Sequence, residues 1–304
     1  MTGAGKRRPG AGDRAAGRFD LTGRTAVVTG AARGLGRAFA AGLAEAGADL
    51  VLVDLPDAPG LVDTAAEVRA HGRKVWTYGQ DLALTGELAG LADRIRAAAG
   101  PVHILVNNAG TAALERFNEI TPESWSRVMR VNADAVFFLS QRLAEHMAAD
   151  LVPGRIVTVT SKNALVAEAG LAHYNAAKAA AQLLTETLAV ELAPHGITAN
   201  TLAPGMVDTP IDGEFPLERE GFEAAYRERI PLGRYARPEE CVGALLLLAS
   251  DAGAYITGAR IVVDGGVLAD QMPRMRFMPP YRSGLTPDGG AGGGAGDGAP
   301  DGAG

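Results

Sequence analysis

Short apolar runs alternate with helical segments along most of the chain. Seven of these runs are almost continuously Val, Ile and Leu, which is typical of strands that are covered on both faces of a parallel sheet. The rhythm of strand, helix and strand predicts right-handed βαβ units, and hence an α/β fold with a doubly wound, seven-stranded parallel sheet. The predicted strands are Thr25–Thr29, Asp49–Val53, Val75–Tyr78, Ile104–Val106, Ile156–Thr160, Ile197–Leu202 and Ile261–Val263.

Helical spacing and capping residues predict the helices between these strands. Apolar residues recur every four positions from Leu35 to Leu43, and Gly47 follows where a glycine cap would end the helix. Two helices are predicted to be long. Pro122–Ala149 begins after Thr121, a suitable N-cap followed by proline, and Tyr174–Ala193 is rich in Ala and Leu.

Composition favours one folded domain with a tail at each end that differs from it in composition. The chain has 304 residues, of which 47% are hydrophobic and 21% charged, enough for one large core. We expect a flexible tail over 1–18, a domain over 19–270 and an extension over 271–304, Gly-rich and disordered from about 283. The stretch Gln271–Arg282 either folds over a neighbouring subunit or is disordered.

Charge and cysteine content exclude several classes of partner. A net charge of −6 without a basic stripe argues against nucleic acid. No apolar stretch follows the basic Lys6–Arg8, so a secretory signal is not expected, and Val242–Ala249 is too short to span a membrane. Cys241 is the only cysteine and is expected to be a buried structural thiol. We therefore expect a cytoplasmic protein.

A glycine-rich turn follows the first predicted strand. Residues Thr29–Gly36 read Thr-Gly-Ala-Ala-Arg-Gly-Leu-Gly and open a helix. Such glycines let the backbone approach a pyrophosphate, and the helix N-terminus offers N–H groups to the anion. A glycine cluster alone is equally consistent with an ordinary turn. Asp54, at the end of the second strand, is placed to bind ribose hydroxyls, so the sequence predicts a dinucleotide site.

A tyrosine, a lysine and a serine form the candidate catalytic set. Tyr174 and Lys178 lie one turn apart on a predicted helix, so their side chains share a face. We expect the ammonium to lower the phenol pKa by about 2–3 units, which requires roughly 3–4 kcal/mol. The pair alone could be surface residues. Ser161 ends a strand at the sheet edge where Gly30 and Asp54 also lie, which favours one site.

Together these motifs resemble the short-chain dehydrogenase/reductase family. The similarity runs from about Phe19 to Leu268 and implies a single Rossmann-type domain. The motifs that carry it are Thr-Gly-x-x-x-Gly-x-Gly at 29–36, Asn107-Asn108-Ala109-Gly110, Asn132, Ser161, Tyr174-x-x-x-Lys178 and Pro204-Gly205.

The resemblance implies a role for each matching position. Tyr174 would be the general acid/base, Ser161 would polarise the substrate oxygen, and Lys178 would hold the nicotinamide ribose. Asn132 would position a proton-relaying water, and no metal is needed for hydride transfer. The implied cofactor-binding residues are Gly30, Arg33, Gly34, Leu35, Gly36, Asp54, Asp81, Leu82, Asn108, Ala109, Gly110, Tyr174, Lys178, Pro204, Gly205, Val207 and Thr209.

The leading hypothesis is an NAD-dependent dehydrogenase acting on a secondary alcohol or ketone. Asp54 would repel the 2′-phosphate of NADP, whereas Arg33 resembles a residue that binds it; we expect Asp54 to prevail. A polyol or sugar acid is the favoured substrate, because the connection Asp54–Gly60 and the stretch Arg229–Arg234 resemble sugar-acid members of the family. The alternatives are an NADPH-dependent 3-oxoacyl ketoreductase and a non-catalytic dinucleotide sensor or scaffold.

The resemblance also implies an assembly and marks two departures. A homotetramer or homodimer would pack the two long helices against their symmetry mates. The substrate pocket is expected from Asn163–Ala172, Met206 and Asp208–Arg229. Lys162 is charged where the family usually has a small or apolar residue, so it either points away or contacts the substrate. His173 is expected to be a packing or surface residue.

Overall fold

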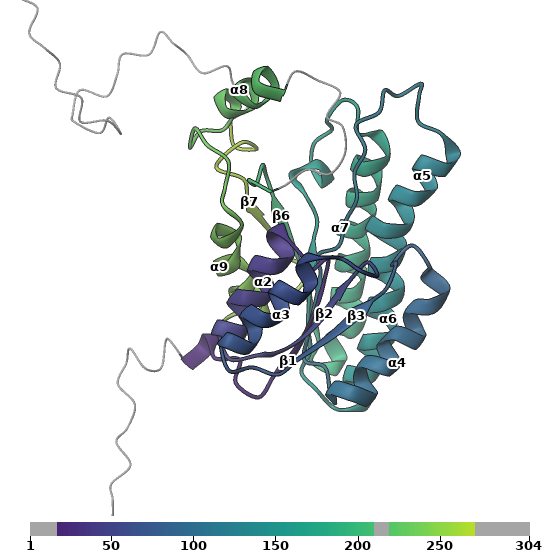
Figure 1. Cartoon of the computed structure of the whole chain (residues 1–304), viewed down its shortest axis with the longest axis vertical. Coiled ribbons are helices and arrows are strands. Elements are labelled where there is room, and N and C mark those ends of the chain that lie inside the picture. Colours follow the sequence, from purple (N-terminus) through teal and green to yellow (C-terminus); the bar gives the residue numbers. More distant parts are fainter. Residues whose placement is uncertain (1–16, 210–218, 271–304) are drawn as a thin grey trace, which may run out of the picture. The chain divides into compact units, whose positions relative to one another are not determined.

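The computed structural model describes residues 17–209 and 219–270, and contains the predicted seven-stranded parallel sheet (Figure 1). The strand order is β3-β2-β1-β4-β5-β6-β7. The order in which strands are added to the sheet therefore reverses between β1 and β4, which is the point where doubly wound sheets bind ligands. Each predicted strand is confirmed to within two residues. The strands are β1 Thr25–Thr29, β2 Asp49–Asp54, β3 Val75–Gly79, β4 Ile104–Asn107, β5 Arg155–Val159, β6 Thr198–Pro204 and β7 Arg260–Val263.

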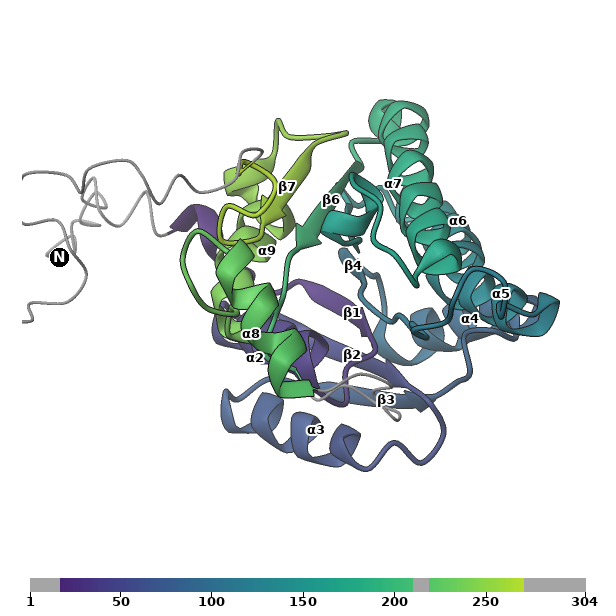
Figure 2. The ribbon, with the colours of Figure 1, turned by 90° about the horizontal axis from the view of Figure 1, so that it is seen from above.

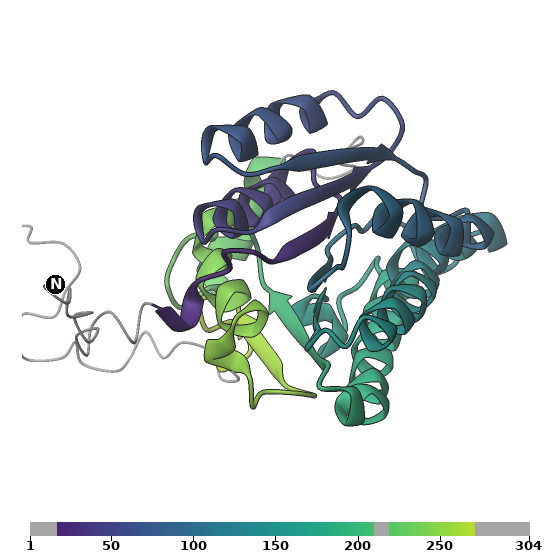
Figure 3. The same ribbon diagram turned by 90° about the horizontal axis from the view of Figure 1, so that it is seen from below.

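Helices cover both faces of the sheet (Figures 2 and 3). On one face lie α2 (Gly34–Glu45), α3 (Gly60–Ala70) and α9 (Val242–Ala249), and on the other lie α4 (Leu88–Ala99), α6 (Ala135–Ala149) and α7 (Ala172–Leu192). Each layer buries its own apolar core against the sheet. Representative buried side chains are Phe39, Leu43 and Leu245 on the first face and Leu91, Ile95, Leu139 and Leu143 on the second.

The predicted helix ends are confirmed where capping chemistry marked them. Gly47 has a φ of +106° just after α2, a left-handed conformation that glycine adopts without strain. At α5 (Pro122–Met129), the Thr121 hydroxyl accepts a hydrogen bond from Ser124 N at 3.1 Å. The second long helix is present as α7 and continues into a 3-10 turn, η5 (Ala193–His195).

The prediction of one continuous α-helix over Pro122–Ala149 is wrong. A π-helical turn, η3 (Arg130–Asp134), separates α5 from α6. Such turns insert a residue into the helical ladder and occur frequently at functional sites. Here the turn carries Asn132, whose buried amide donates to Val128 O at 2.9 Å and to Thr111 O at 2.7 Å. The polar side chain therefore stays buried within the helix layer.

Short elements complete the described chain. Residues 1–269 form one unit and residues 270–304 another. The predicted tails 1–18 and 271–304 lie outside the described residues, except that Gly17 and Arg18 begin a short turn. The remaining elements are η1 (Gly17–Phe19), η2 (Thr85–Glu87), η4 (Lys162–Ala164), α8 (Arg219–Arg229), η6 (Pro238–Cys241) and η7 (Asp251–Gly253).

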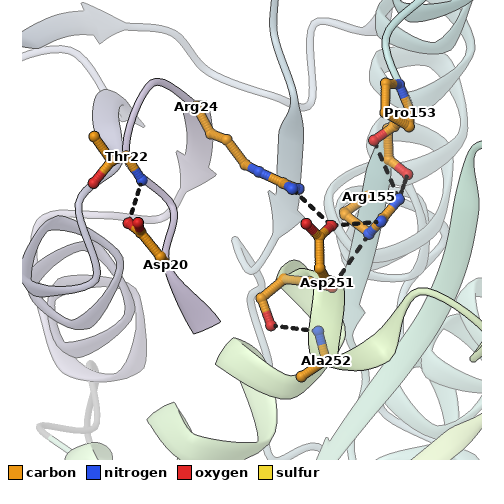
Figure 4. Close-up of polar contacts among 9 residues, drawn as sticks. Asp20, Thr22, Arg24, Pro153, Arg155, Asp251 and Ala252 are labelled. Atoms are coloured by element: carbon orange, nitrogen blue, oxygen red, sulfur yellow. Dashed lines mark hydrogen bonds and ion pairs between the residues drawn. The ribbon is translucent and has the colours of Figure 1, made fainter. Parts of the chain in front are cut away.

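An ionic cluster joins elements at the amino ends of the strands (Figure 4). Asp251 Oδ1 accepts from Arg24 at 2.7 Å and from Arg155 at 3.3 Å. The Arg155 side chain is only 5% exposed and also donates to the carbonyls of Pro153 and Gly154. These contacts tie the start of β1 to the start of β5, so the cluster has a structural role at the edge opposite the candidate site.

Candidate active site

The glycine-rich turn is shaped by its own packing against the end of β4. Gly30 has a φ of +65°, and a Cβ there would lie 2.8 Å from Ala109 Cα. A Cβ on Gly36 would lie 1.9 Å from Gly30 O. The Thr29 hydroxyl accepts from the backbone N–H groups of Asn108 and Ala109, each at 3.0 Å. The turn and the β4 end are therefore one rigid unit that only glycine permits.

Residues from three other strand ends lie around this turn. A Cβ on Gly34 would lie 3.1 Å from Thr209 Cγ2, so the segment after β6 packs against the turn. The Asp54 carboxylate accepts from Ala32 N at 2.7 Å and from Leu55 N at 2.8 Å, which fixes it beside the turn. Asp81, after β3, pairs with Arg127 at 2.7 Å, and its neighbour Leu82 is buried.

Ser161, Tyr174 and Lys178 meet at the end of β5 and the first turns of α7. Ser161 follows β5 and its hydroxyl accepts from Asn163 N at 3.1 Å. Tyr174 is half-buried and Lys178 is buried. The Lys178 ammonium donates to Val159 O at 2.9 Å and lies 5.7 Å from the centre of the Tyr174 ring. The structure thus brings together the three side chains that the sequence singled out.

The expectation that Lys178 lowers the pKa of Tyr174 is wrong for the protein alone. Burial raises the pKa of the Tyr174 phenol, a hydrogen bond with Ser161 partly opposes this, and the charge of Glu168 raises it further. Burial also lowers the pKa of Lys178 to about 8, because removal from water disfavours the charged ammonium. The one-turn spacing does place Tyr174 and Lys178 on the same helix face, but the Lys178 ammonium donates to the backbone carbonyl of Val159.

Asn132 is poised beside the lysine. Its Oδ1 is buried and has no hydrogen-bond partner among the residues that the structure describes, although both amide hydrogens are used. A Cβ on Gly110 would lie 2.8 Å from this Oδ1 and 3.3 Å from Lys178 Nζ, so Gly110 keeps the two polar atoms in one small space. A buried acceptor of this kind usually binds an ordered water, which suits a proton relay from Lys178.

Comparison with known proteins identifies the family. The family profile described as enoyl-(acyl carrier protein) reductase matches residues 30–268. The chain is 36% identical to 2-dehydro-3-deoxy-D-gluconate 5-dehydrogenase of Escherichia coli (strain K12), over 83% of this chain and 98% of that protein. A solved short-chain type dehydrogenase/reductase from Mycobacterium marinum is 34% identical, with a TM-score of 0.76, over 82% of this chain and 97% of that one. This chain belongs to the short-chain dehydrogenase/reductase family.

A further relative was solved with bound ligands. The gluconate 5-dehydrogenase from Burkholderia cenocepacia J2315, solved in complex with NADP and tartrate, is 35% identical with a TM-score of 0.76, over 84% of this chain and 99% of that one. The present short-chain dehydrogenase/reductase is accordingly an NAD(P)-dependent oxidoreductase that acts on CH–OH groups. Its glycine turn, the free N–H groups that begin α2 and the fixed Asp54 fit the phosphates and ribose of such a dinucleotide.

Two contacts of this short-chain dehydrogenase/reductase could not be found from its sequence. His173, expected to pack or to lie at the surface, is fully buried. Its Nδ1 accepts from Tyr174 N at 2.9 Å, and its Nε2 lies 2.9 Å from Glu115 Oε2. Ser124 donates to the same carboxylate. This chain of contacts anchors the start of α7; Glu115 gave no signal because it lies in an irregular stretch without periodicity.

Lys162 does not point into solvent. The ammonium of Lys162, which directly follows Ser161, is shared among Asn163, Glu168 and Tyr226 of α8. Part of the predicted substrate segment Asp208–Arg229, namely residues 210–218, lies outside the described residues. Within the described parts of the chain, no helix is long and apolar enough to cross a membrane, and no three His, Cys, Asp or Glu side chains form a metal site.

Lys178→Met is expected to stabilise the protein without cofactor. Folding depresses the pKa of Lys178 from 10.5 to about 8, so keeping it charged costs about 3 kcal/mol at pH 7. The unfolded chain holds this proton more tightly, so the cost is full below pH 8 and disappears as pH rises towards 10.5. After loss of the bond to Val159 O, a net gain of about 1–2 kcal/mol is expected.

Thermal unfolding checks this expectation. The melting temperature of Lys178→Met should exceed that of wild type by a few degrees at pH 7, and the difference should shrink between pH 8 and 10. Lys74→Met, at an exposed lysine before β3, is the matched control and should show no such pH dependence. An equal or lower melting temperature for Lys178→Met at pH 7 would mean that the ammonium is satisfied where it lies.

Proposed function

We propose that the protein is an NAD-preferring dehydrogenase that oxidises a secondary alcohol of a polyol or sugar acid, or reduces the matching ketone. The observation that carries this proposal is the meeting of Ser161, Tyr174 and Lys178 at the end of β5, beside the glycine turn and the fixed Asp54 carboxylate. A scaffold that only bound dinucleotide would have no need for an oriented serine beside a tyrosine at this point.

In this proposal each side chain handles one part of the proton transfer. Ser161 holds the substrate oxygen, and Tyr174 takes the hydroxyl proton during oxidation or returns it during reduction. Lys178 and the water site at Asn132 Oδ1 pass that proton towards solvent. The bound nicotinamide supplies hydride exchange and, when oxidised, a positive charge. That charge would favour the phenolate, which burial alone disfavours.

The relatives support the substrate class. The Escherichia coli relative acts on a deoxygluconate and the Burkholderia cenocepacia relative on gluconate, and the latter structure holds tartrate. All three are hydroxylated acids. Because that neighbour also binds NADP, an NADPH-dependent ketoreductase is the second candidate. We also propose a cytoplasmic location; burial of Cys241, which raises its pKa to about 11, suits a reducing compartment.

An absorbance assay near 340 nm tests the function. The protein is incubated with NAD and a panel of polyols and sugar acids, and with NADH and the matching ketones. Turnover that consumes one dinucleotide per alcohol supports the proposal. Thermal shifts with NAD or NADH alone are measured in parallel, because a ligand that binds the folded state raises its stability. A protein that binds dinucleotide tightly and turns over none of the panel would be a sensor or scaffold.

We expect a homodimer or homotetramer that buries the outer face of α7. Ala179, Leu183, Thr187 and Val190 are exposed at helical spacing along it, with Leu183 65% and Val190 77% exposed. A mainly apolar exposed stripe of this kind is typical of a symmetric interface. Light scattering should therefore give two or four times the chain mass, and Leu183→Glu should reduce a dimer to the monomer or a tetramer to a smaller species.

Val62→Glu is the matched control for this assembly. Val62 is 72% exposed on α3, on the opposite face of the sheet, so its replacement should leave the oligomer intact. A wild-type monomer would contradict the assembly, and dissociation by Val62→Glu alone would move the interface to the other face.

A further inference from the structure

A buried ion pair lies next to the reaction residues. The Lys162 side chain is 7% exposed. Its ammonium contacts Glu168 Oε2 at 2.9 Å, Asn163 Oδ1 at 3.0 Å and the Tyr226 hydroxyl at 3.2 Å. An ammonium group has three donor hydrogens, and each has an acceptor in this arrangement. Lys162 therefore has no hydrogen left with which to bind a substrate.

The same contacts engage only one oxygen of Glu168. Its Oε2 accepts from Lys162 and, at 3.0 Å, from Asn163 Nδ2. Its Oε1 accepts no hydrogen bond from the residues that the structure describes, yet it is not among their buried unpaired atoms, and the side chain is 26% exposed. Glu168 thus presents one open acceptor oxygen on a carboxylate whose other oxygen is fixed.

This cluster is joined to both reaction residues. Asn163 N donates to Ser161 Oγ at 3.1 Å. Asn175, directly after Tyr174, accepts from Asn163 Nδ2 at 2.9 Å and donates to Glu168 O at 2.9 Å. The charge of Glu168 also reaches the Tyr174 phenol, where it helps to raise the pKa. A substrate oxygen held between Ser161 and Tyr174 would therefore have Glu168 as a neighbour.

We propose that Glu168 is a specificity-determining residue that accepts a hydrogen bond from a hydroxyl on the carbon next to the reacting carbon. Lys162 is a positioning residue that fixes the orientation of the carboxylate through its contact with Glu168 Oε2. The substrate class is then a vicinal diol, and a carboxylate at that neighbouring position is disfavoured by like charge. A sugar acid fits when its carboxylate is remote from the reacting carbon. The inference rests on the proposed function.

Glu168→Gln should replace the open acceptor oxygen, Oε1, by a hydrogen-bond donor. Lys162 and Asn163 both require an acceptor, so the amide oxygen of the glutamine should turn to them and leave its NH₂ facing the substrate. With NAD saturating, kcat/KM is measured for cis-1,2-cyclohexanediol, cyclohexanol and 2-hydroxycyclohexanecarboxylate. Wild type should prefer the diol to cyclohexanol by at least about tenfold, the value of one charge-assisted hydrogen bond. The variant should lose this preference, and the hydroxy acid should gain relative to the diol.

Lys162→Met tests the positioning role. This variant should also reduce the diol preference, mainly by raising KM for the diol. The double variant Lys162→Met/Glu168→Gln should lose no more than the larger single effect, because both changes act through one carboxylate. Lys74→Met and Glu45→Gln, at exposed sites away from the cluster, are the matched controls and should keep the wild-type ratio. NADH binding, followed by its fluorescence, verifies that each variant is folded.

The outcomes separate this inference from the proposed function. If the variants slow the diol and cyclohexanol equally, or change neither, the cluster does not select the substrate and the inference fails. If wild type oxidises cyclohexanol as well as the diol, the inference fails while the dehydrogenase proposal stands. If wild type binds NADH but oxidises no alcohol of either panel, the proposed function fails and the inference falls with it.

Discussion

Tyr174→Phe is expected to lower turnover at least about 10²-fold while NAD binding persists. The substitution removes one hydroxyl and leaves the ring, which packs half-buried in the first turns of α7. The lost group is the only one of the three reaction side chains that can exchange a proton directly with the substrate oxygen held by Ser161. Steady-state kcat and KM for an alcohol oxidised by wild type, with NADH binding measured separately, provide the check.

The pH profile distinguishes a chemical role of Tyr174 from a packing role. Because burial raises its pKa, oxidation by wild type should speed up as pH rises and the phenol loses its proton. Tyr174→Phe should lose that dependence. Tyr255→Phe, at a fully exposed tyrosine, is the matched control and should behave as wild type. Near-normal turnover by Tyr174→Phe would favour a different proton-transferring group.

The inner strands β1, β2, β4, β5 and β6 were predictable because burial on both faces requires an almost unbroken apolar run, whereas the edge strands β3 and β7 are only partly buried. Thr25–Thr29, for example, is buried at all five positions and was predicted with its observed ends. The break in the helix that follows Thr121 was not predictable, since the residues of the π-helical turn fit an α-helical pattern equally well. Only the placement of Asn132 in the interior distinguishes the two, and a single sequence does not show burial.

The candidate site was predictable only as far as local spacing determines it. One helical turn places Tyr174 and Lys178 on the same face, but the carbonyl of Val159 that binds the ammonium comes from a different element. The expected lowering of the tyrosine pKa was wrong because burial of the phenol raises this pKa, and local spacing does not show burial. Glu168 and Tyr226 lie in segments expected to form the substrate pocket, but their contacts with Lys162 were not predicted because these depend on the paths of a loop and of α8. The unusual charge after Ser161 was the one available signal.

Asp54→Ala is expected to shift the cofactor preference towards NADP by at least about tenfold in the ratio of kcat/KM values, or about 1.4 kcal/mol. Wild type should prefer NAD by a similar factor. In the structure, both Asp54 oxygens accept backbone hydrogen bonds, from Ala32 and Leu55, so the carboxylate cannot rotate away from a 2′-phosphate. Repulsion between such closely placed like charges is expected to outweigh one attractive arginine.

Arg33 is the opposing group, and its position explains why the carboxylate should dominate. It is exposed at the start of α2, where water screens its charge. The residues after Asp54 are Leu55 and Pro56, so no second basic side chain follows to clamp the phosphate. A relative with the same fold was solved with NADP, so the fold itself does not exclude the 2′-phosphate and the choice is left to these local charges.

Four variants separate the effects of Asp54 and Arg33 on the choice between NAD and NADP. Asp54→Asn keeps the shape but removes the charge, so it should relax the preference almost as far as Asp54→Ala. Adding Arg33→Ala to Asp54→Ala should then weaken NADP use, because the arginine becomes the main group that favours the phosphate. Asp63→Ala, at an exposed position on α3, is the matched control and should leave the ratio unchanged. Wild type that works better with NADPH would show that Arg33 governs the site, since the fixed carboxylate would then be tolerating the phosphate it is expected to repel.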